Sequence, residues 1–457
     1  MQKRIIQISF QIIIAIFLFH LSSCKAVSLF QEQSKVTHPQ WSKNAVIYEV
    51  NIRQYTPEGT FKAFEKHLPE LKQLGVDILW LMPINPIGEL NRKGTLGSYY
   101  SIKNYKAVNP EFGTLDDLKS LVTKIHSLGM HVIIDWVANH TSWDNVWTKT
   151  HPDFYTRDSN GNFVSPVADW SDVIDLNYDN KELWTYMIDA MSYWIKECNI
   201  DGFRCDVAAM VPTEFWIEAR KELSKIKSDI FMLAEASENY LHQAFDMTYN
   251  WQLKDLINKV AKGTKKASDI ISYYNQEKKD YNDDDYRMVF TSNHDENSWN
   301  GTVYERLDGA AETFAVLCGV VKGMPLIYSG QEAGLNKRLR FFDKDTIDWK
   351  PSPMRQIYTD LNNLKKYNKA LWNGLAGGEM KFLETGNNDV LAFIREKNNN
   401  KVLAIFNLSP TNQTINLSSP LIKGDFSILF EDGKKITFSE SEKFQLTPWK
   451  YLIYFKL

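Results

Sequence analysis

Short, nearly all-apolar runs alternate with helical patterns along most of this 457-residue chain. Runs that are apolar on both faces are typical of parallel strands covered by helices. The sequence predicts eight such strands, which are Ala45–Tyr55, Val76–Met82, His131–Val137, Gly202–Asp206, Ile230–Ala234, Phe245–Tyr249, Met288–Thr291 and Pro325–Tyr328. An open, doubly wound sheet usually carries a Gly-rich phosphate loop after its first strand, and none is present here. The pattern therefore favours an α/β fold of the (β/α)8 (TIM) barrel type.

Two regions depart from this alternation. Residues 140–177 are rich in Asp, Asn, Trp and Pro and lack helical periodicity, which predicts a short loop-rich insertion after the third strand. From about residue 376 the chain changes to short alternating runs separated by Asn, Gly and Ser, a pattern typical of an antiparallel β-sandwich. We predict a barrel domain over 44–375, which includes the insertion, and a C-terminal β-domain over 376–457.

The N-terminus has the features of a targeting segment. A basic start, Met1–Arg4, precedes an apolar run that ends in Leu21-Ser-Ser-Cys24. This ending resembles the lipobox of a bacterial lipoprotein, in which the signal is cleaved before the Cys and the thiol is lipidated. We therefore expect a signal peptide over 1–23, lipidation at Cys24, a tether over 24–43 and a lipid anchor in a bacterial cell envelope. The alternatives are an ordinary secretory signal or an uncleaved anchor helix.

Charge and composition limit the classes of molecule that this protein is expected to bind. The net charge is -3, so no basic excess is available to neutralise phosphates, and a nucleic-acid partner is disfavoured. The chain has 14 Trp, 21 Tyr and 25 Phe, whose flat faces can stack on sugar rings, although most aromatic residues fill cores. The cysteines other than Cys24 have no metal-like spacing and imply no disulfide framework.

Charged side chains gather at the predicted carboxyl ends of four strands, where the active site of a (β/α)8 barrel lies. They are Asp135 and His140, Arg204 and Asp206, Glu235, and His294 and Asp295. Arg204 and Asp206 are two positions apart, so they face the same way on a strand, and we expect the guanidinium to keep Asp206 ionised. A structural ion pair is the simpler explanation for that pair alone. Polar groups from four strands converging on one mouth favour a functional site.

These residues resemble the motifs of the α-amylase family of retaining glycoside hydrolases. Its four short motifs are matched in order and spacing by Asp135-x-Val-x-Asn-His140, Gly202-Phe-Arg-x-Asp206, Glu235 and Asn293-His-Asp295. Longer stretches, Gly97–Tyr105, Val108–Thr114 and Gly323–Glu332, are also similar. The ordered set is far more specific than any one motif.

The resemblance implies a role for each matched residue. Asp206 is the expected nucleophile, Glu235 the general acid/base, and Asp295 the carboxylate that holds substrate hydroxyls. The expected substrate-binding residues are Tyr100, His140, Arg204 and His294. Retention requires two carboxyl groups roughly 5 Å apart, one ionised and one protonated. Glu235 follows an apolar strand, an environment expected to raise its pKa.

The chain departs from the family after the nucleophile. Many members have Lys-His where this chain has Ala209-Met210, and in those members the His backbone helps to bind calcium. We expect an apolar wall at these positions and no required cofactor. A calcium ion held by Asn139 remains an option, with Asp169, Asp172 and Asp175 as further oxygen donors.

The resemblance predicts an enzyme that cleaves mainly α-1,4 bonds in starch, maltodextrins or related α-glucans. Two alternatives use the same chemistry: an α-glucan transglycosylase and an oligo-1,6-glucosidase. A non-enzymatic alternative is an inactive relative that binds glycans or serves a transporter. Such relatives lack one or more of the carboxylates, whereas Asp206, Glu235 and Asp295 are all present here.

Overall fold

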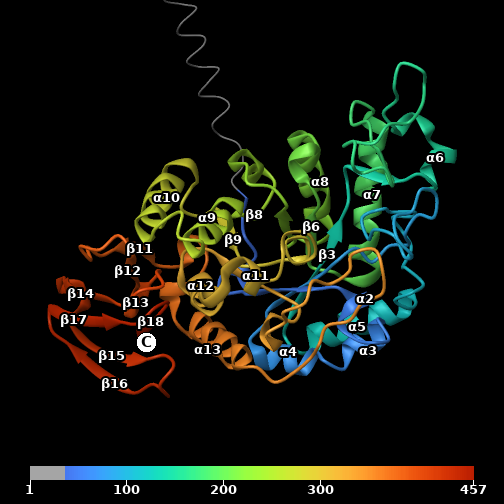
Figure 1. Ribbon diagram of the computed structural model, residues 1–457. Helices are drawn as coiled ribbons and strands as arrows, with labels where there is room; N and C mark the ends of the chain where they lie inside the picture. Colours follow the sequence, from blue (N-terminus) through green and yellow to red (C-terminus); the bar gives the residue numbers. More distant parts are fainter. Residues whose placement is uncertain (1–35) are drawn as a thin grey trace, which may run out of the picture. The chain divides into compact units, whose positions relative to one another are not determined.

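The computed structural model describes residues 36–457 (Figure 1). The predicted signal peptide, Cys24 and most of the predicted tether lie outside the described residues. Within 36–457, no helix is both long and apolar enough to cross a membrane.

Eight parallel strands form a closed barrel in the order β1-β10-β9-β8-β7-β6-β3-β2. Their bounds are β1 Ile47–Val50, β2 Ile78–Leu81, β3 His131–Trp136, β6 Gly202–Cys205, β7 Phe231–Ala234, β8 Met247–Tyr249, β9 Tyr286–Val289 and β10 Met324–Tyr328. Buried side chains such as Trp80, Phe231 and Met288 form a cluster inside it. The predicted (β/α)8 barrel is therefore confirmed.

Helices surround the barrel (Figure 1). The longer ones are α5 Leu115–Ser127, α7 Lys181–Cys198, α8 Thr213–Ile226, α9 Trp251–Ala261, α10 Ala267–Asp280, α12 Ala311–Val320 and α13 Pro353–Tyr367. The segment 61–74 forms two short helices, α3 Phe61–Glu65 and α4 Leu68–Leu74. Pro69 lies in the first turn of α4, where its missing N–H costs nothing, but it could not continue a helix from α3. The strand expected over 45–55 is shorter because α2, Ile52–Tyr55, follows it.

A two-stranded sheet closes the insertion at its base. Strands β4, His140–Ser142, and β5, Val173–Asp175, pair antiparallel, with His140 opposite Asp175. The two ends of the excursion are thus joined by backbone hydrogen bonds, which fixes His140 beside the barrel. Between them lies α6, Trp147–Thr150.

The C-terminal domain contains a six-stranded antiparallel sheet, ordered β11-β12-β13-β18-β15-β16, and a two-stranded sheet, β14-β17. The bounds are β11 Glu379–Phe382, β12 Val390–Lys397, β13 Asn400–Asn407, β14 Gln413–Ser418, β15 Gly424–Ile428, β16 Lys435–Phe438, β17 Ser441–Leu446 and β18 Tyr451–Lys456. Both sheets contribute to one buried cluster, for example Leu403 of β13 and Ile415 of β14. The predicted C-terminal β-domain is confirmed.

Candidate active site

A cavity of about 600 Å³ opens at the carboxyl ends of the barrel strands. Six residues predicted from the sequence line it: Tyr100, His140, Asp206, Glu235, His294 and Asp295. The seventh, Arg204, is fully buried next to Asp206 and Glu235, with which it forms ion pairs. The barrel thus brings together side chains that lie up to 195 positions apart in the chain, from Tyr100 to Asp295.

Arg204 connects the acidic residues of the site. Its Nη1 lies 2.8 Å from Asp135 Oδ1 and 2.9 Å from Asp206 Oδ1, and its Nη2 lies 2.9 Å from Glu235 Oε2. Its Nε donates to the Tyr249 hydroxyl at 3.2 Å. Because neighbouring parallel strands β3, β6 and β7 carry these groups at matching heights, one planar guanidinium can reach three carboxylates.

Burial raises the pKa of the carboxyl groups in this cluster. Burial, followed by the charge of Glu235, raises the pKa of Asp206 well above its usual value, although Arg204 opposes the shift. Burial also raises the pKa of Glu235, against the charges of Arg204 and His294. Arg204 is shared with Asp135 and Glu235, so it does not hold the pKa of Asp206 low as expected from the sequence. Raised pKa values of this kind favour a proton on one of the acids.

Val207 has an unusual backbone conformation directly after Asp206. Its φ of +37° lies in the left-handed region, which a β-branched residue rarely adopts. In this conformation its backbone N–H donates to Glu235 Oε2 at 2.9 Å. The strained turn therefore couples the chain after Asp206 to the second carboxyl group, and strain of this kind is typical of functional sites.

Tyr100 and His294 also line the cavity. The Tyr100 hydroxyl lies 2.8 Å from His294 Nε2 and donates to Asp135 Oδ2 at 3.1 Å. The ring of Tyr100 is nearly parallel to that of Phe341, with centroids 6.2 Å apart. Asp295 Oδ2 lies 3.3 Å from His294 Nε2, so these groups form one continuous polar network.

His140 lies beside the cavity as a neutral imidazole. Burial lowers its pKa to about 3, so the ring carries one proton at neutral pH and can donate one hydrogen bond. Its Nδ1 lies 3.3 Å from Asn139 Nδ2, and its ring lies 5.4 Å from that of Trp170, centroid to centroid.

Several residues of the site were not predicted from the sequence. Trp170, Trp299, Phe341 and Phe342 line the cavity. Another, Glu49, contacts His294 from strand β1. A Glu within the apolar run Val46–Val50 is a signal that could have identified it.

Comparison with known proteins places this geometry in a family. Residues 30–166 and 166–369 match the alpha amylase catalytic domain, and residues 380–453 match the maltogenic amylase C-terminal domain. The chain belongs to the alpha-amylase family. It is thus a member of a family of glycoside hydrolases.

Several relatives match this chain over most of its length, and two of them have known structures. It is 32% identical to an alpha-amylase from Lactobacillus plantarum, covering 91% of this chain and 100% of that one, with a TM-score of 0.81. A maltogenic alpha-amylase from Thermotoga neapolitana is 31% identical, with 91% and 99% coverage and a TM-score of 0.83. Alpha-amylase 3 of Dictyoglomus thermophilum is 24% identical over 90% of this chain and 93% of its own.

Three of the four residues considered as calcium ligands contact other side chains in this amylase-family chain. The Asn139 amide nitrogen faces His140, and Lys93 Nζ lies 3.0 Å from Asp172 Oδ1 and donates to the Asp169 carbonyl at 2.6 Å. Within residues 36–457, no group of three or more His, Cys, Asp or Glu side chains is arranged to hold a metal ion. An ammonium group thus pairs with Asp172, one of the carboxylates considered as calcium ligands.

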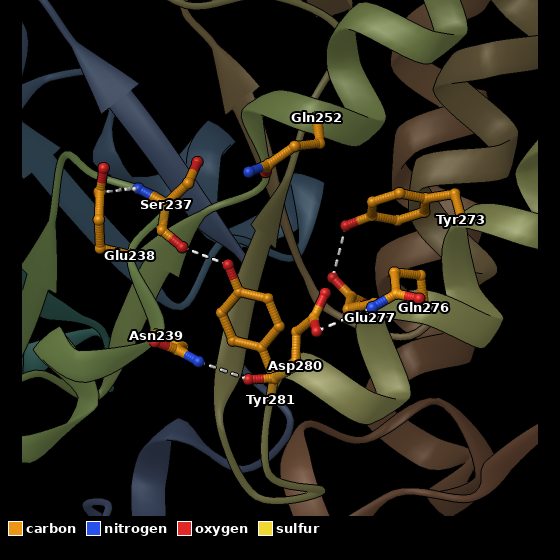
Figure 2. A pocket seen from close by; sticks show the side chains of 9 residues that line it. All are labelled: Ser237, Glu238, Asn239, Gln252, Tyr273, Gln276, Glu277, Asp280 and Tyr281. Carbon is orange, nitrogen blue, oxygen red and sulfur yellow. Dashed lines mark hydrogen bonds between the residues drawn. The ribbon is translucent and has the colours of Figure 1, made fainter.

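A second hollow, of about 410 Å³, has a different character (Figure 2). Figure 2 shows the Tyr281 ring at its centre, with the hydroxyl directed at the Ser237 carbonyl. Its buried carboxylate, Glu277, is already held by Arg287 Nε at 3.3 Å and by the Asn250 amide at 3.0 Å. None of the predicted site residues lines this hollow, so we assign the active site to the barrel mouth.

Proposed function

We propose that this protein is a retaining glycoside hydrolase that cleaves α-glucosidic bonds, mainly α-1,4, in starch, maltodextrins or related α-glucans. The observation that carries the proposal is the pair Asp206 and Glu235, which face one cavity and share the guanidinium of Arg204. Sharing one planar cation keeps the two carboxyl groups close, as retention requires, since a retaining pair is roughly 5 Å apart.

In the proposed reaction, Asp206 attacks the anomeric carbon and forms a covalent glycosyl-enzyme, while Glu235 gives its proton to the departing glycosidic oxygen. Glu235, now ionised, then takes a proton from water, and the resulting hydroxide displaces Asp206. The Val207 N–H and Arg204 both favour the ionised Glu235 between these steps, because each donates to or pairs with Oε2. Asp295 and the two His side chains are positioned at the cavity to hold sugar hydroxyls.

Aromatic side chains provide a surface for further sugar units. Trp299 is 51% exposed although it is large and apolar, and its ring lies 5.2 Å from that of Phe341 and 5.6 Å from that of Phe342. All three line the cavity. We propose that Trp299 stacks on a glucose ring beyond the bond that is cleaved.

Linkage preference depends on the wall next to the nucleophile. An apolar wall was expected from Ala209 and Met210, but neither residue lines the cavity. The apolar residue that follows the proposed nucleophile and does line it is Val207. An apolar contact discriminates less than hydrogen bonds to a leaving sugar would. We therefore propose a preference for α-1,4 bonds with some tolerance of α-1,6 bonds.

Four measurements test the reaction and its specificity. Asp206→Ala and Glu235→Gln should each abolish turnover while leaving the thermal unfolding temperature nearly unchanged, because both side chains lie at strand ends. Proton NMR of the first products should show the α-anomer; a β-anomer would exclude retention.

Initial rates on maltotetraose should exceed those on isomaltose, and the reverse order would indicate an oligo-1,6-glucosidase. Longer products at high substrate concentration would indicate a transglycosylase.

We further propose that the protein is anchored to a bacterial envelope membrane through a lipid on Cys24. The support is the basic start, the apolar run and the small residues before Cys24. Cys24→Ser should move the protein from the membrane fraction to the soluble fraction. Membrane association that survives this change would point to an uncleaved helix or to a protein partner.

A further inference from the structure

A buried carboxylate lies in the barrel wall beneath His294. Glu49 is on β1, where it pairs with Trp80 of β2 and with Tyr328 of β10. It is fully buried, with 0% of its surface exposed. Its Oε1 lies 2.5 Å from His294 Nδ1. Its Oε2 is buried without a hydrogen-bond partner in the described part of the chain. A charge buried in this way costs stability, so the side chain calls for an explanation other than packing.

His294 transmits this contact to the cavity. Its Nδ1 faces Glu49, while its Nε2 lies 2.8 Å from the Tyr100 hydroxyl and 3.3 Å from Asp295 Oδ2. Tyr100 in turn donates to Asp135 Oδ2, and Asp135 Oδ1 pairs with Arg204. A continuous polar chain therefore runs from β1 to the guanidinium that holds the two proposed catalytic carboxyl groups.

The charged groups around His294 favour a protonated ring. Burial and the positive charge of Arg204 act against that charge, whereas Asp295 and Glu49 act for it and prevail, raising the pKa of His294 to about 9. Of these two carboxylates, only Glu49 is fully buried, since Asp295 has a side chain that is 35% exposed. The influence of Asp295 is therefore screened by water more than that of Glu49. Burial raises the pKa of Glu49 as well, but the charge and hydrogen bond of His294 oppose this shift and favour the ion pair.

We propose that Glu49 is a positioning residue of the active site: it fixes the His294 ring by accepting from Nδ1–H, and its buried negative charge keeps both ring nitrogens protonated. Nε2–H is then always available as a donor at the cavity. There it can bond to Asp295, to the Tyr100 oxygen or to a hydroxyl of the sugar whose bond is cleaved. The last of these roles rests on the proposed function; the effect of Glu49 on His294 does not.

The test compares Glu49→Gln with Glu277→Gln in the full chain. The Gln side chain has the size of Glu and can still accept from Nδ1–H, but it has no charge. Glu277 is a matched control because it is also buried and paired with a cation, Arg287, outside the cavity. NMR of ¹⁵N-labelled His side chains, assigned with His294→Gln, measures the protonation of His294 without any substrate.

We expect the pKa of His294 to fall from about 9 to about its ordinary value of 6.5 in Glu49→Gln and to stay in place in Glu277→Gln. At about pH 7.5, kcat/KM of Glu49→Gln should fall by roughly tenfold to a hundredfold, the size of a lost charge-assisted hydrogen bond. The loss should shrink at about pH 5.5, where His294 is protonated in both proteins. Glu49→Asp, which restores the charge, should recover part of the activity at the higher pH.

An unchanged His294 titration in Glu49→Gln would refute the positioning role, even if the enzyme is an active α-glucosidase. A loss of activity that is the same at both pH values would also refute it, because a purely structural role has that signature. Absence of hydrolysis by the wild-type protein on every α-glucan would instead refute the proposed function and leave the titration result standing.

Discussion

Replacing Gly202 with Ala should destabilise the barrel by about 3 kcal/mol. Gly202 begins β6, and a Cβ placed on it would lie 1.9 Å from the backbone oxygen of Phe231 on β7, whereas real Cβ contacts essentially never fall below 3.0 Å. The strands must therefore part by about 1 Å, and a backbone oxygen cannot rotate away as a side chain can. Overpacking of this kind costs about 2 kcal/mol. Weakening the adjacent bond from Phe231 N–H to the Asp201 carbonyl, 2.9 Å long, adds about 1 kcal/mol.

The same change should also reduce activity, because β6 carries Arg204 and β7 leads to Glu235, whose ion pair spans the two strands. Gly309→Ala is the matched control: its Cβ would lie 3.6 Å from the nearest atom, in Trp449, and its φ is not positive. Urea unfolding followed by tryptophan fluorescence gives the free energies, and initial rates on maltotetraose give the activity. Gly202→Ala with the stability and rate of Gly309→Ala would refute the reasoning.

Three further predictions concern other parts of the molecule. Burial acts to raise the pKa of Asp201, but hydrogen bonds with His126 and Lys227, together with His131 nearby, outweigh it and hold the pKa well below the usual value. Asp201→Asn should therefore cost about 3 kcal/mol near pH 7, and urea unfolding should show this gap narrowing as the pH falls below about 4, because the unfolded chain then binds a proton at Asp201 while the folded carboxylate stays ionised to lower pH. Trp299→Ala should raise KM for maltoheptaose about tenfold and leave KM for maltotriose less affected, as one lost stacking contact would. EDTA should leave both activity and unfolding temperature unchanged, because Lys93 already pairs with Asp172, one of the carboxylates considered as ligands; an effect that calcium reverses would contradict this.

The strand ends were predictable because the barrel is a regular object. Once eight apolar runs alternate with helices, the residue after each run must lie at one mouth, whatever its distance along the chain. Asp206, Glu235 and Asp295 were found in this way, and all three line the cavity. The sequence needed to supply only the order of the elements.

Contacts that depend on side-chain packing were not predictable in this way. The partner of Glu49 is His294, 245 positions away, and strand order alone does not show which inward-facing groups meet. The five-residue π-helix Glu296–Asn300, which presents Trp299, has no periodic pattern that would indicate it. The pKa of Asp206 depends on how many carboxylates share Arg204, a number that only the assembled barrel determines.

The two ends of strand β6 have different roles, one in stability and one in the proposed active site. At its start, the Asp201 carboxylate accepts from the Val132 N–H at 2.8 Å and from Lys227 Nζ at 2.6 Å, and Gly202 lets β7 approach closely. At its other end, Asp206 is buried among like charges and Val207 is held in a left-handed conformation. Crowded acids and a strained turn both cost stability, so they persist only where the surroundings hold them in place. The contacts at the start of β6 stabilise the barrel and offset this cost. The carboxyl end of the strand can therefore keep Asp206 and Val207 in a geometry that suits the proposed reaction.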